Sequence, residues 1–292
     1  SSPIPPPPGI GYAPRRSTRW WIPVAVIGGL LLLIVVGFGV FFSIIISGLE
    51  DEPKKYDVRD KSVLVLDLSG GLREYKAPLT LNFGDGPSGP TLFEVVSALR
   101  RAKSDDKISG VYIRSGGGGI GMAKLAEIRD ALVEFRSSGK FAYAFIDGGS
   151  KSHYYLASAA DSIFMPQEGM LEFNAFGATA PFMKGLFDKL GVQWHVEQFE
   201  EYKSAAETMT RDKWSAPAKE ELRELIQQRH DMFVKAVSDG RKLDAATVTS
   251  LMSQGVYTPD SLKAHGLIDG FARESDSRSA STDVSSRTTA RI

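Results

Sequence analysis

The feature that most constrains this chain is an uncharged run near its N-terminus. From Trp20 to Leu49 there is no charged residue, and from Ile22 to Ile46 the chain is almost continuously apolar. About 20 residues in a helix cross the hydrocarbon core of a bilayer, so the run predicts a single transmembrane helix over residues 20–49. A cleavable signal peptide has a shorter apolar core, roughly 7–15 residues, and ends at a small-residue site. This run is longer and ends in Ile-Ile-Ile-Ser-Gly-Leu, which favours a retained anchor.

The charges that flank this run predict its orientation. Arg15, Arg16 and Arg19 precede it, whereas acidic and basic residues follow it in mixed order. Basic residues concentrate on the cytoplasmic side of a membrane helix. We therefore expect a single-pass protein of the plasma (inner) membrane, with the N-terminus cytoplasmic and the part after Leu49 extracytoplasmic. The lipid bilayer is then one expected partner.

Composition argues against several classes of site and partner. The chain has 35 basic and 35 acidic side chains, and this zero net charge argues against nucleic acid as an electrostatic partner. It has no cysteine, which excludes disulfides and thiolate metal sites. Its four histidines show no metal-binding spacing. We therefore expect neither a metal nor another cofactor.

Strand and helix patterns alternate along residues 62–271, and this alternation predicts the fold class. Short apolar runs predict strands, and apolar residues three or four apart predict helices. The predicted strands are 62–68, 108–114, 141–146, 162–165 and 192–199. The predicted helices are 92–103, 122–135, 154–160, 181–190 and 217–238, with Thr91 and Ser215 as caps. Such alternation is typical of a mainly parallel α/β sheet with right-handed crossovers.

Three segments outside this predicted domain and the membrane helix lack such periodicity. Residues 1–19 are proline-rich, which predicts a disordered cytoplasmic tail. Residues 50–61 form a charged linker. Residues 272–292 are rich in serine, arginine and threonine, which predicts a second disordered tail.

Lys203 is the residue that points most directly to chemistry. It lies between the Val/Phe-rich run 192–199 and a pair of small residues, Ala205 and Ala206. A lysine that loses water at the end of a strand can become neutral, and a neutral lysine is a general base for a serine nucleophile. The nearby acids, Glu200, Glu201 and Glu207, would instead favour the charged form if they pointed at it.

The surrounding residues carry a family resemblance. Residues 202–212, Tyr-Lys-Ser-Ala-Ala-Glu-Thr-Met-Thr-Arg-Asp, resemble the catalytic-lysine motif of the signal peptide peptidase A family, also called protease IV or peptidase S49. Thr208 stands where that motif usually has proline. The family consists of Ser-Lys membrane proteases, and the resemblance covers roughly residues 62–270. It implies a ClpP/crotonase-like spiral of β-β-α units, the general-base role for Lys203, and assembly into homo-oligomeric rings. Periodicity alone does not distinguish this spiral from a doubly wound sheet.

A glycine cluster follows the second predicted strand. Gly116, Gly117 and Gly118 belong to a run of four glycines after Ser115. Backbone N–H groups of such a turn can bind an anion, which in acyl transfer is the oxyanion. The run is neither a P-loop nor a G-x-G-x-x-G dinucleotide fingerprint in its context. A flexible turn without a binding role is the alternative.

The segment from Ser150 to Ser158 bears on the nucleophile. In short, single-domain members of the family this helix start has the sequence Ala-Ser-Gly-Gly-Tyr-Tyr, and its serine is the nucleophile. Alignment of the tyrosine pair places Lys151 at that serine, with Ser150 and Ser152 out of register. This pattern resembles the N-terminal half of the long, two-copy form, in which the first copy supplies the lysine and the second copy supplies the serine.

The expected function is therefore a membrane-anchored Ser-Lys serine endopeptidase that degrades cleaved signal peptides. This chain would supply Lys203, and a second copy of the domain would supply the serine. The alternative is a catalytically inactive scaffold or peptide-binding homologue. A crotonase-like acyl-CoA enzyme would share the fold, but an extracytoplasmic domain faces away from the CoA pool. The sequence leaves open the peptide preference, the number of subunits and whether Lys203 is desolvated.

Overall fold

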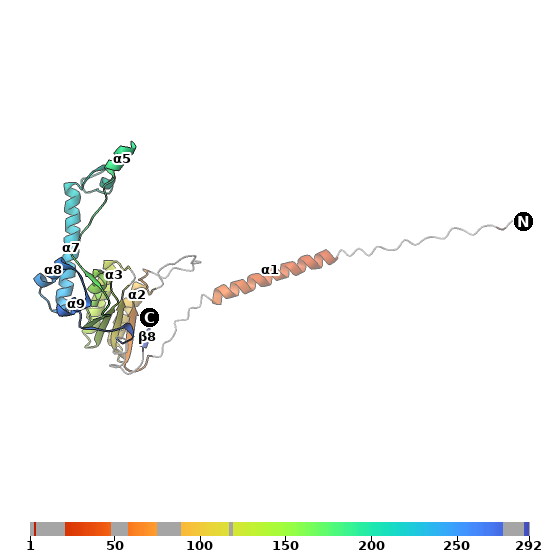
Figure 1. The fold of residues 1–292 in the computed structure, drawn as a ribbon. Coiled ribbons are helices and arrows are strands. Elements are labelled where there is room, and N and C mark those ends of the chain that lie inside the picture. The colour runs from red at the N-terminus through yellow and green to blue at the C-terminus, as the bar shows by residue number, and fades with distance from the viewer. Residues whose placement is uncertain are drawn as a thin grey trace. The chain divides into compact units, whose positions relative to one another are not determined.

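The computed structural model describes residues 3, 21–47, 58–74, 89–116, 119–276 and 289–291 (Figure 1). The chain divides into two units, Ser1–Lys55 and Tyr56–Ile292. The predicted tail over residues 1–19, apart from Pro3, and most of the predicted linker over residues 50–61 lie outside the described residues.

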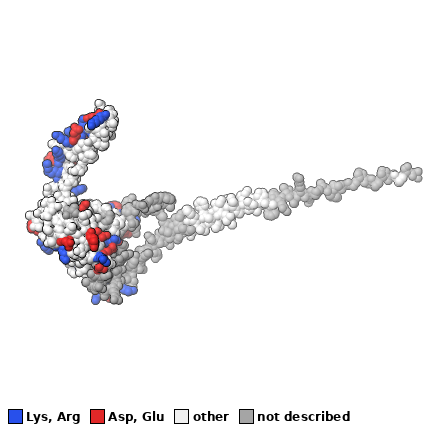
Figure 2. All heavy atoms as spheres, viewed as in Figure 1, with Lys and Arg blue, Asp and Glu red and all other residues white. Residues whose placement is uncertain are grey.

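The first unit contains one helix, α1 (Trp21–Ser47), among its described residues. At 1.5 Å per residue its 27 residues extend about 40 Å, which exceeds the hydrocarbon thickness of a bilayer. None of its side chains between Ile22 and Ser43 is buried, and Figure 2 shows no charged atoms on the described part of α1. By length and composition, α1 fits the membrane span predicted over residues 20–49.

The second unit is built on a six-stranded parallel sheet. Its strands have the order β7-β4-β3-β2-β1-β8, and every neighbouring pair is parallel. A separate pair, β5 (Leu171–Phe173) and β6 (Gly255–Tyr257), is antiparallel. The sheet therefore confirms the predicted α/β class. Its strands are β1 (Ser62–Asp67), β2 (Ile108–Ser115), β3 (Phe141–Ile146), β4 (Ser162–Met165), β7 (Gly270–Phe271) and β8 (Thr289–Arg291).

The helices follow the predicted strand–helix alternation. Thr91 caps the first helix of this unit through a capping box with Glu94, and Ser215 caps the longest one by accepting from the Ala218 N–H. Both caps confirm the predictions. The helices are α2 (Leu92–Ser104), α3 (Met122–Arg136), α4 (Lys151–Ala157), α5 (Lys184–Leu190), α6 (Glu207–Thr210), α7 (Ala216–Arg241), α8 (Ala245–Gln254) and α9 (Pro259–Ala264).

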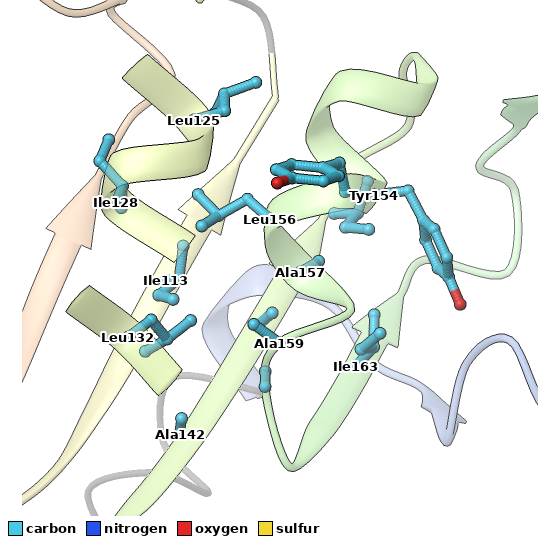
Figure 3. Packing of buried hydrophobic residues seen from close by; sticks show 14 of the residues in the cluster. Ile113, Leu125, Ile128, Leu132, Ala142, Tyr154, Leu156, Ala157, Ala159 and Ile163 are labelled. Carbon is cyan, nitrogen blue, oxygen red and sulfur yellow. The ribbon is translucent and has the colours of Figure 1, made fainter. Parts of the chain in front are cut away.

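The main core lies between the sheet and the helices that follow its strands. Figure 3 shows Leu125, Ile128 and Leu132 of α3 packed near Leu156 of α4 and Ile113 of β2. All five side chains are buried. A fully buried leucine or isoleucine contributes roughly 1.5–3 kcal/mol relative to its exposed state, so these contacts fix α3 and α4 on the sheet.

A buried arginine joins three helices of this core. The guanidinium of Arg129 in α3 donates to the Tyr155 carbonyl at 2.7 Å and to Ser158 Oγ at 2.9 Å. Its other terminal nitrogen donates to the Ala236 carbonyl in α7 at 2.6 Å. Arg129 is only 7% exposed, so these acceptors replace the water that its charge loses on burial. The C-terminal half of α7 is thereby fixed to α3 and α4.

Two sequence predictions need correction. The strand predicted over residues 192–199 is wrong, because these residues are exposed and form no strand in the structure. Apolar residues do alternate at Val192, Trp194 and Val196, but no described strand lies beside them, and a strand requires a hydrogen-bonded partner.

The second correction concerns the disordered tail predicted over residues 272–292. Residues 289–291 form β8, which pairs in parallel with Val63–Val65 of β1. Without β8, β1 would be the edge of the sheet, and its unpaired N–H and C=O groups would accept another strand. Glu274 in the same segment forms an ion pair with Arg114 at 3.2 Å. Residues 277–288 of this tail lie outside the described residues.

We predict that Arg129→Met destabilises the folded unit by about 2–3 kcal/mol, because the substitution removes a charged donor from buried acceptors. Thermal unfolding of residues 56–292 measures this as a fall of roughly 4–10 °C in the midpoint. The matched control is Arg100→Met, since the Arg100 side chain is 64% exposed and lies 3.9 Å from Glu134. Equal midpoints for the two variants would show that Arg129 does not hold the helices together.

Candidate active site

Lys203 lies on an arm outside the core. We define the arm as residues 177–231, between Phe176 and Phe233, which pack against the core. Figure 1 shows α5 at the far end of α7 from the core-packed end. Of the arm residues, all of which the structure describes, only Glu207 and Ala218 are buried. The arm therefore does not depend on the main core for its internal structure.

Aromatic pairs and backbone hydrogen bonds hold the arm together instead. The rings of Phe182 and Trp214 meet edge to face with centroids 5.1 Å apart. Those of Phe187 and Trp194 lie 5.5 Å apart. Such pairs contribute about 0.5–1.5 kcal/mol beyond the area they bury. The arm is thus a small folded element, in which Figure 2 shows basic and acidic side chains intermixed.

Lys203 is exposed and lies in a loop between two turns. Sequence reasoning placed it at the end of a buried strand, and the structure does not. It borders an open groove of about 310 Å³ whose apolar lining includes Val196, Phe199, Ala205 and Ala206. Within the described part of the chain, the Lys203 ammonium has no hydrogen bond or ion pair. Its nitrogen is therefore available to an external group beside an apolar surface.

Glu207, the acid of the lysine motif, points into the arm rather than toward Lys203. It is only 2% exposed, and its Oε2 accepts from the Ser215 N–H at 2.8 Å. Its Oε1 lies 3.7 Å from Arg211 Nε, one helical turn along the motif. Burial alone would raise the pKa of Glu207, but the Ser215 hydrogen bonds and the Arg211 charge outweigh burial and lower it. Glu207 thus braces the lysine loop against the start of α7.

The predicted anion-binding glycines lie at the carboxyl edge of the sheet. Gly116 and Gly148 line a cavity of about 160 Å³ where β2 and β3 end. Gly117 and Gly118 lie outside the described residues. Arg114 also lines this cavity, and it forms ion pairs with Asp67 at 3.3 Å and with Glu274 at 3.2 Å. Two carboxylates therefore already neutralise the one cation that the described lining contains.

Lys151 is the first residue of α4, and its side chain is hydrogen-bonded to a loop. The Lys151 ammonium donates to Asn174 Oδ1 at 2.5 Å and to the Ala175 carbonyl at 3.0 Å. Burial lowers the pKa of Lys151, and Glu172 opposes this shift. On either side of Lys151, the Ser150 N–H donates to His153 Nδ1 at 3.3 Å, and Ser152 Oγ lies 3.7 Å from the Met122 sulfur. Neither serine contacts Lys203 in the structure.

The structure thus separates the candidate groups. Lys203 belongs to the arm, whereas Gly116 and the start of α4 belong to the core. The groove at Lys203 and the glycine cavity have no lining residue in common. No group of three or more His, Asp or Glu that could hold a metal occurs among the described residues.

Sequence reasoning missed the roles of Glu207 and Lys151. The i, i+4 spacing of Glu207 and Arg211 was a usable signal, because residues four apart meet on a helix. The partners of Lys151 lie 23 to 25 residues away on a loop, and no local pattern reveals them.

Comparisons with known proteins point to one family. The family model described as peptidase family S49 matches residues 134–284, just over half of the chain. The chloroplastic serine protease SPPA of Arabidopsis thaliana is 31% identical over 211 residues, which are 72% of this chain and 30% of that protein. Protease 4 of Salmonella typhi is 29% identical over 273 residues, 86% of this chain and 43% of that protein.

A third relative is also much longer than the part of it that matches this chain. Protease 4 of Haemophilus influenzae is 29% identical over 220 residues, 72% of this chain and 36% of that protein. The chain therefore spans less than half the length of each of these curated relatives.

We predict that Glu207→Gln loosens the lysine loop, because an uncharged amide is a weaker acceptor for the Ser215 N–H. Hydrogen exchange at neutral pH should accelerate about tenfold over residues 207–218. Since the folded-state pKa of Glu207 is lowered, its stabilisation is present at neutral pH and is lost as the pH falls through that pKa. The exchange rates of the wild type and of Glu207→Gln should therefore become equal in acid. Glu221→Gln, an exposed site on α7, is the control, and equal exchange in both variants at neutral pH would refute the brace.

Proposed function

This chain belongs to peptidase family S49, and on that premise we propose that it is the lysine-bearing part of a membrane-anchored Ser-Lys endopeptidase that degrades cleaved signal peptides. Lys203 is the general base, and the nucleophilic serine belongs to a second copy of the fold. The observation that carries the proposal is the position of Lys203. Its nitrogen is exposed, lacks a partner within the described residues and borders an apolar groove on the arm.

The chemistry requires a neutral Lys203 at the moment of attack. The serine oxygen adds to the peptide carbonyl while Lys203 takes the serine proton, and backbone N–H groups stabilise the oxyanion. The resulting ammonium then donates that proton to the leaving amine. A water molecule next attacks the acyl-serine ester, with Lys203 again as the base, which releases the acid and restores the serine. Coverage of the groove by substrate or by a second copy would remove water from Lys203 and favour the neutral form.

Two observations support a serine that comes from outside this copy. The family resemblance aligns Lys151 with the nucleophile of the short members, and the Ser150 N–H and Ser152 Oγ lie against His153 and Met122. The relatives are also more than twice as long as the part that matches this chain. A second copy in a longer polypeptide, or in another subunit, would supply the missing group.

The arm also offers a surface for assembly, which supports a homo-oligomer. Large apolar side chains are exposed on it, and an assembly partner or an apolar peptide would shield them from water. The unpaired run 192–199 has the alternation of a strand and would accept a partner strand there. The exposed apolar side chains are Leu186, Leu190, Val192, Trp194, Val196, Phe199, Tyr202 and Leu225.

The proposed location follows from α1 and its flanking charges. A helix that is apolar throughout and buries no side chains between Ile22 and Ser43 is costly in water and stable in a bilayer. Arginines on its N-terminal side favour a cytoplasmic N-terminus and an extracytoplasmic catalytic domain. Signal peptides left in the bilayer after cleavage would then lie close to the enzyme.

We predict that Lys203→Ala lowers kcat for hydrolysis of a synthetic signal peptide by about 10²- to 10⁴-fold, the usual contribution of a general base. The assay uses the enzyme with its full set of domains or subunits. Lys189→Ala, which removes an exposed lysine from α5 on the same arm, should leave the rate unchanged. An unchanged rate in the Lys203 variant would refute the base assignment. A chain that binds the peptide without hydrolysing it would indicate a peptide-binding scaffold.

We also predict that α1 anchors the chain with the stated orientation. After expression in bacterial cells, the full chain should stay in the membrane pellet on alkaline carbonate extraction, because α1 is embedded in the hydrocarbon. Deletion of residues 1–49 should move the protein to the soluble fraction. Protease added to spheroplasts should digest the part after Leu49 in the full chain. Its protection from that protease would contradict the orientation, and a full chain in the soluble fraction would contradict the anchor.

A further inference from the structure

The arm is joined to the core at two places, and Lys151 contacts one of them. The chain enters the arm after residues 174–176 and returns through α7 at Phe233. The ring of Phe176 meets that of Phe233 at 5.8 Å and 73°, so the two connections touch each other. Movement of residues 174–176 would therefore move the base of the arm, and with it Lys203.

Lys151 binds all three residues of the entering connection. Its ammonium donates to Asn174 Oδ1 at 2.5 Å and to the Ala175 carbonyl at 3.0 Å. The same nitrogen lies 4.3 Å from the centre of the Phe176 ring, in a cation–π contact. An ammonium has three donor hydrogens, and two oxygens and one ring face provide for all of them. Three consecutive residues are thus held by one side chain.

The backbone of Lys151 is itself fixed in the core. It is the first residue of α4, whose Tyr154, Tyr155, Leu156 and Ala157 are buried. Tyr154 donates to the Leu267 carbonyl at 2.6 Å, and the Tyr155 carbonyl accepts from Arg129. The Lys151 side chain therefore extends from a rigid base to the only residues that lead into the arm from β5.

Residues beyond Phe176 lack comparable attachment. From residue 177 to residue 183 every side chain is exposed or partly exposed. The Met183 N–H donates to the Thr208 carbonyl at 2.8 Å, which lies within the arm and not in the core. The contacts of residues 174–176 are thus the last contacts with the core before the chain enters the arm.

We propose that Lys151 is a positioning residue, whose ammonium locks Asn174, Ala175 and Phe176 to the core and thereby sets the orientation in which the arm presents Lys203. The position that the resemblance aligns with a nucleophile here holds residues 174–176, the arm root, in place. This inference rests on the proposed function only for its effect on the reaction rate. Its effect on the structure stands without it.

The test compares Lys151→Met, which keeps the length of the side chain and removes its charge, with Lys151→Arg, which keeps the charge. Lys235→Met on α7 is the control, because this side chain is 78% exposed and pairs with Asp239 rather than with residues 174–176. Hydrogen exchange of residues 174–183 and steady-state hydrolysis of a synthetic signal peptide are measured on the complete enzyme. Thermal unfolding reports on the core separately.

We expect Lys151→Met to accelerate exchange over residues 174–183 about tenfold, the loss that corresponds to one charge-assisted hydrogen bond. The rate constant kcat should fall by about the same factor with KM unchanged, because the groove remains while Lys203 is misplaced. Lys151→Arg should recover at least half of the lost kcat, and the unfolding midpoint should stay constant. Lys235→Met should change none of these quantities.

Two kinds of failure are distinguishable. If Lys151→Met leaves both exchange and kcat unchanged while Lys203→Ala abolishes hydrolysis, the positioning role is wrong and the proposed function stands. If exchange accelerates but kcat does not change, Lys151 holds the arm root without positioning Lys203, which also overturns the proposal. If the wild-type enzyme has no peptidase activity, the proposed function fails, and the exchange measurement alone decides whether Lys151 locks the root.

Discussion

The docking of α7 onto the core is the constraint on which the rest of the structure depends. Its C-terminal half buries Phe233, Val234 and Val237, and Arg129 binds its backbone at Ala236. Gly240 approaches so closely that an added Cβ would lie 1.9 Å from the Ser158 carbonyl oxygen. Because the helix is continuous, this attachment also carries its exposed N-terminal half and the arm. The attachment of α7 to the core thus contributes to the placement of a lysine that lies outside the core.

Local signals account for the parts of the fold that could be predicted. The strands 141–146 and 162–165 agree with the prediction residue for residue, since apolar runs bounded by turns specify buried parallel strands. The caps at Thr91 and Ser215 are local as well. The run 192–199 has the same alternation but no neighbouring strand among the described residues, whereas β8 pairs with β1. Whether a segment becomes a strand depends on a partner strand from a distant part of the chain. A local sequence pattern contains no information about that partner.

The sequence named candidate residues for the site, but it did not predict how they are arranged. The motif around Lys203 identified the family that the S49 match then established, and it also contained Glu207, whose carboxylate braces the loop from inside. The family resemblance placed Lys151 where a serine was expected. Its contacts are with a loop 23 to 25 residues away, which no local pattern reveals. The structure therefore shows contacts for Lys151 that the sequence did not predict. Lys151 is bonded to the residues that lead into the arm, and the arm contains Lys203.

The most direct test of this account is the site at which a serine-reactive fluorophosphonate labels the complete enzyme. Such a probe reacts much faster with a serine that a neighbouring base activates than with an ordinary serine. The account predicts that peptide mass spectrometry finds the label on a serine of a second copy of the fold, and that Lys203→Ala abolishes labelling. A label on Ser150 or Ser152 of this chain, or labelling that persists without Lys203, would contradict it.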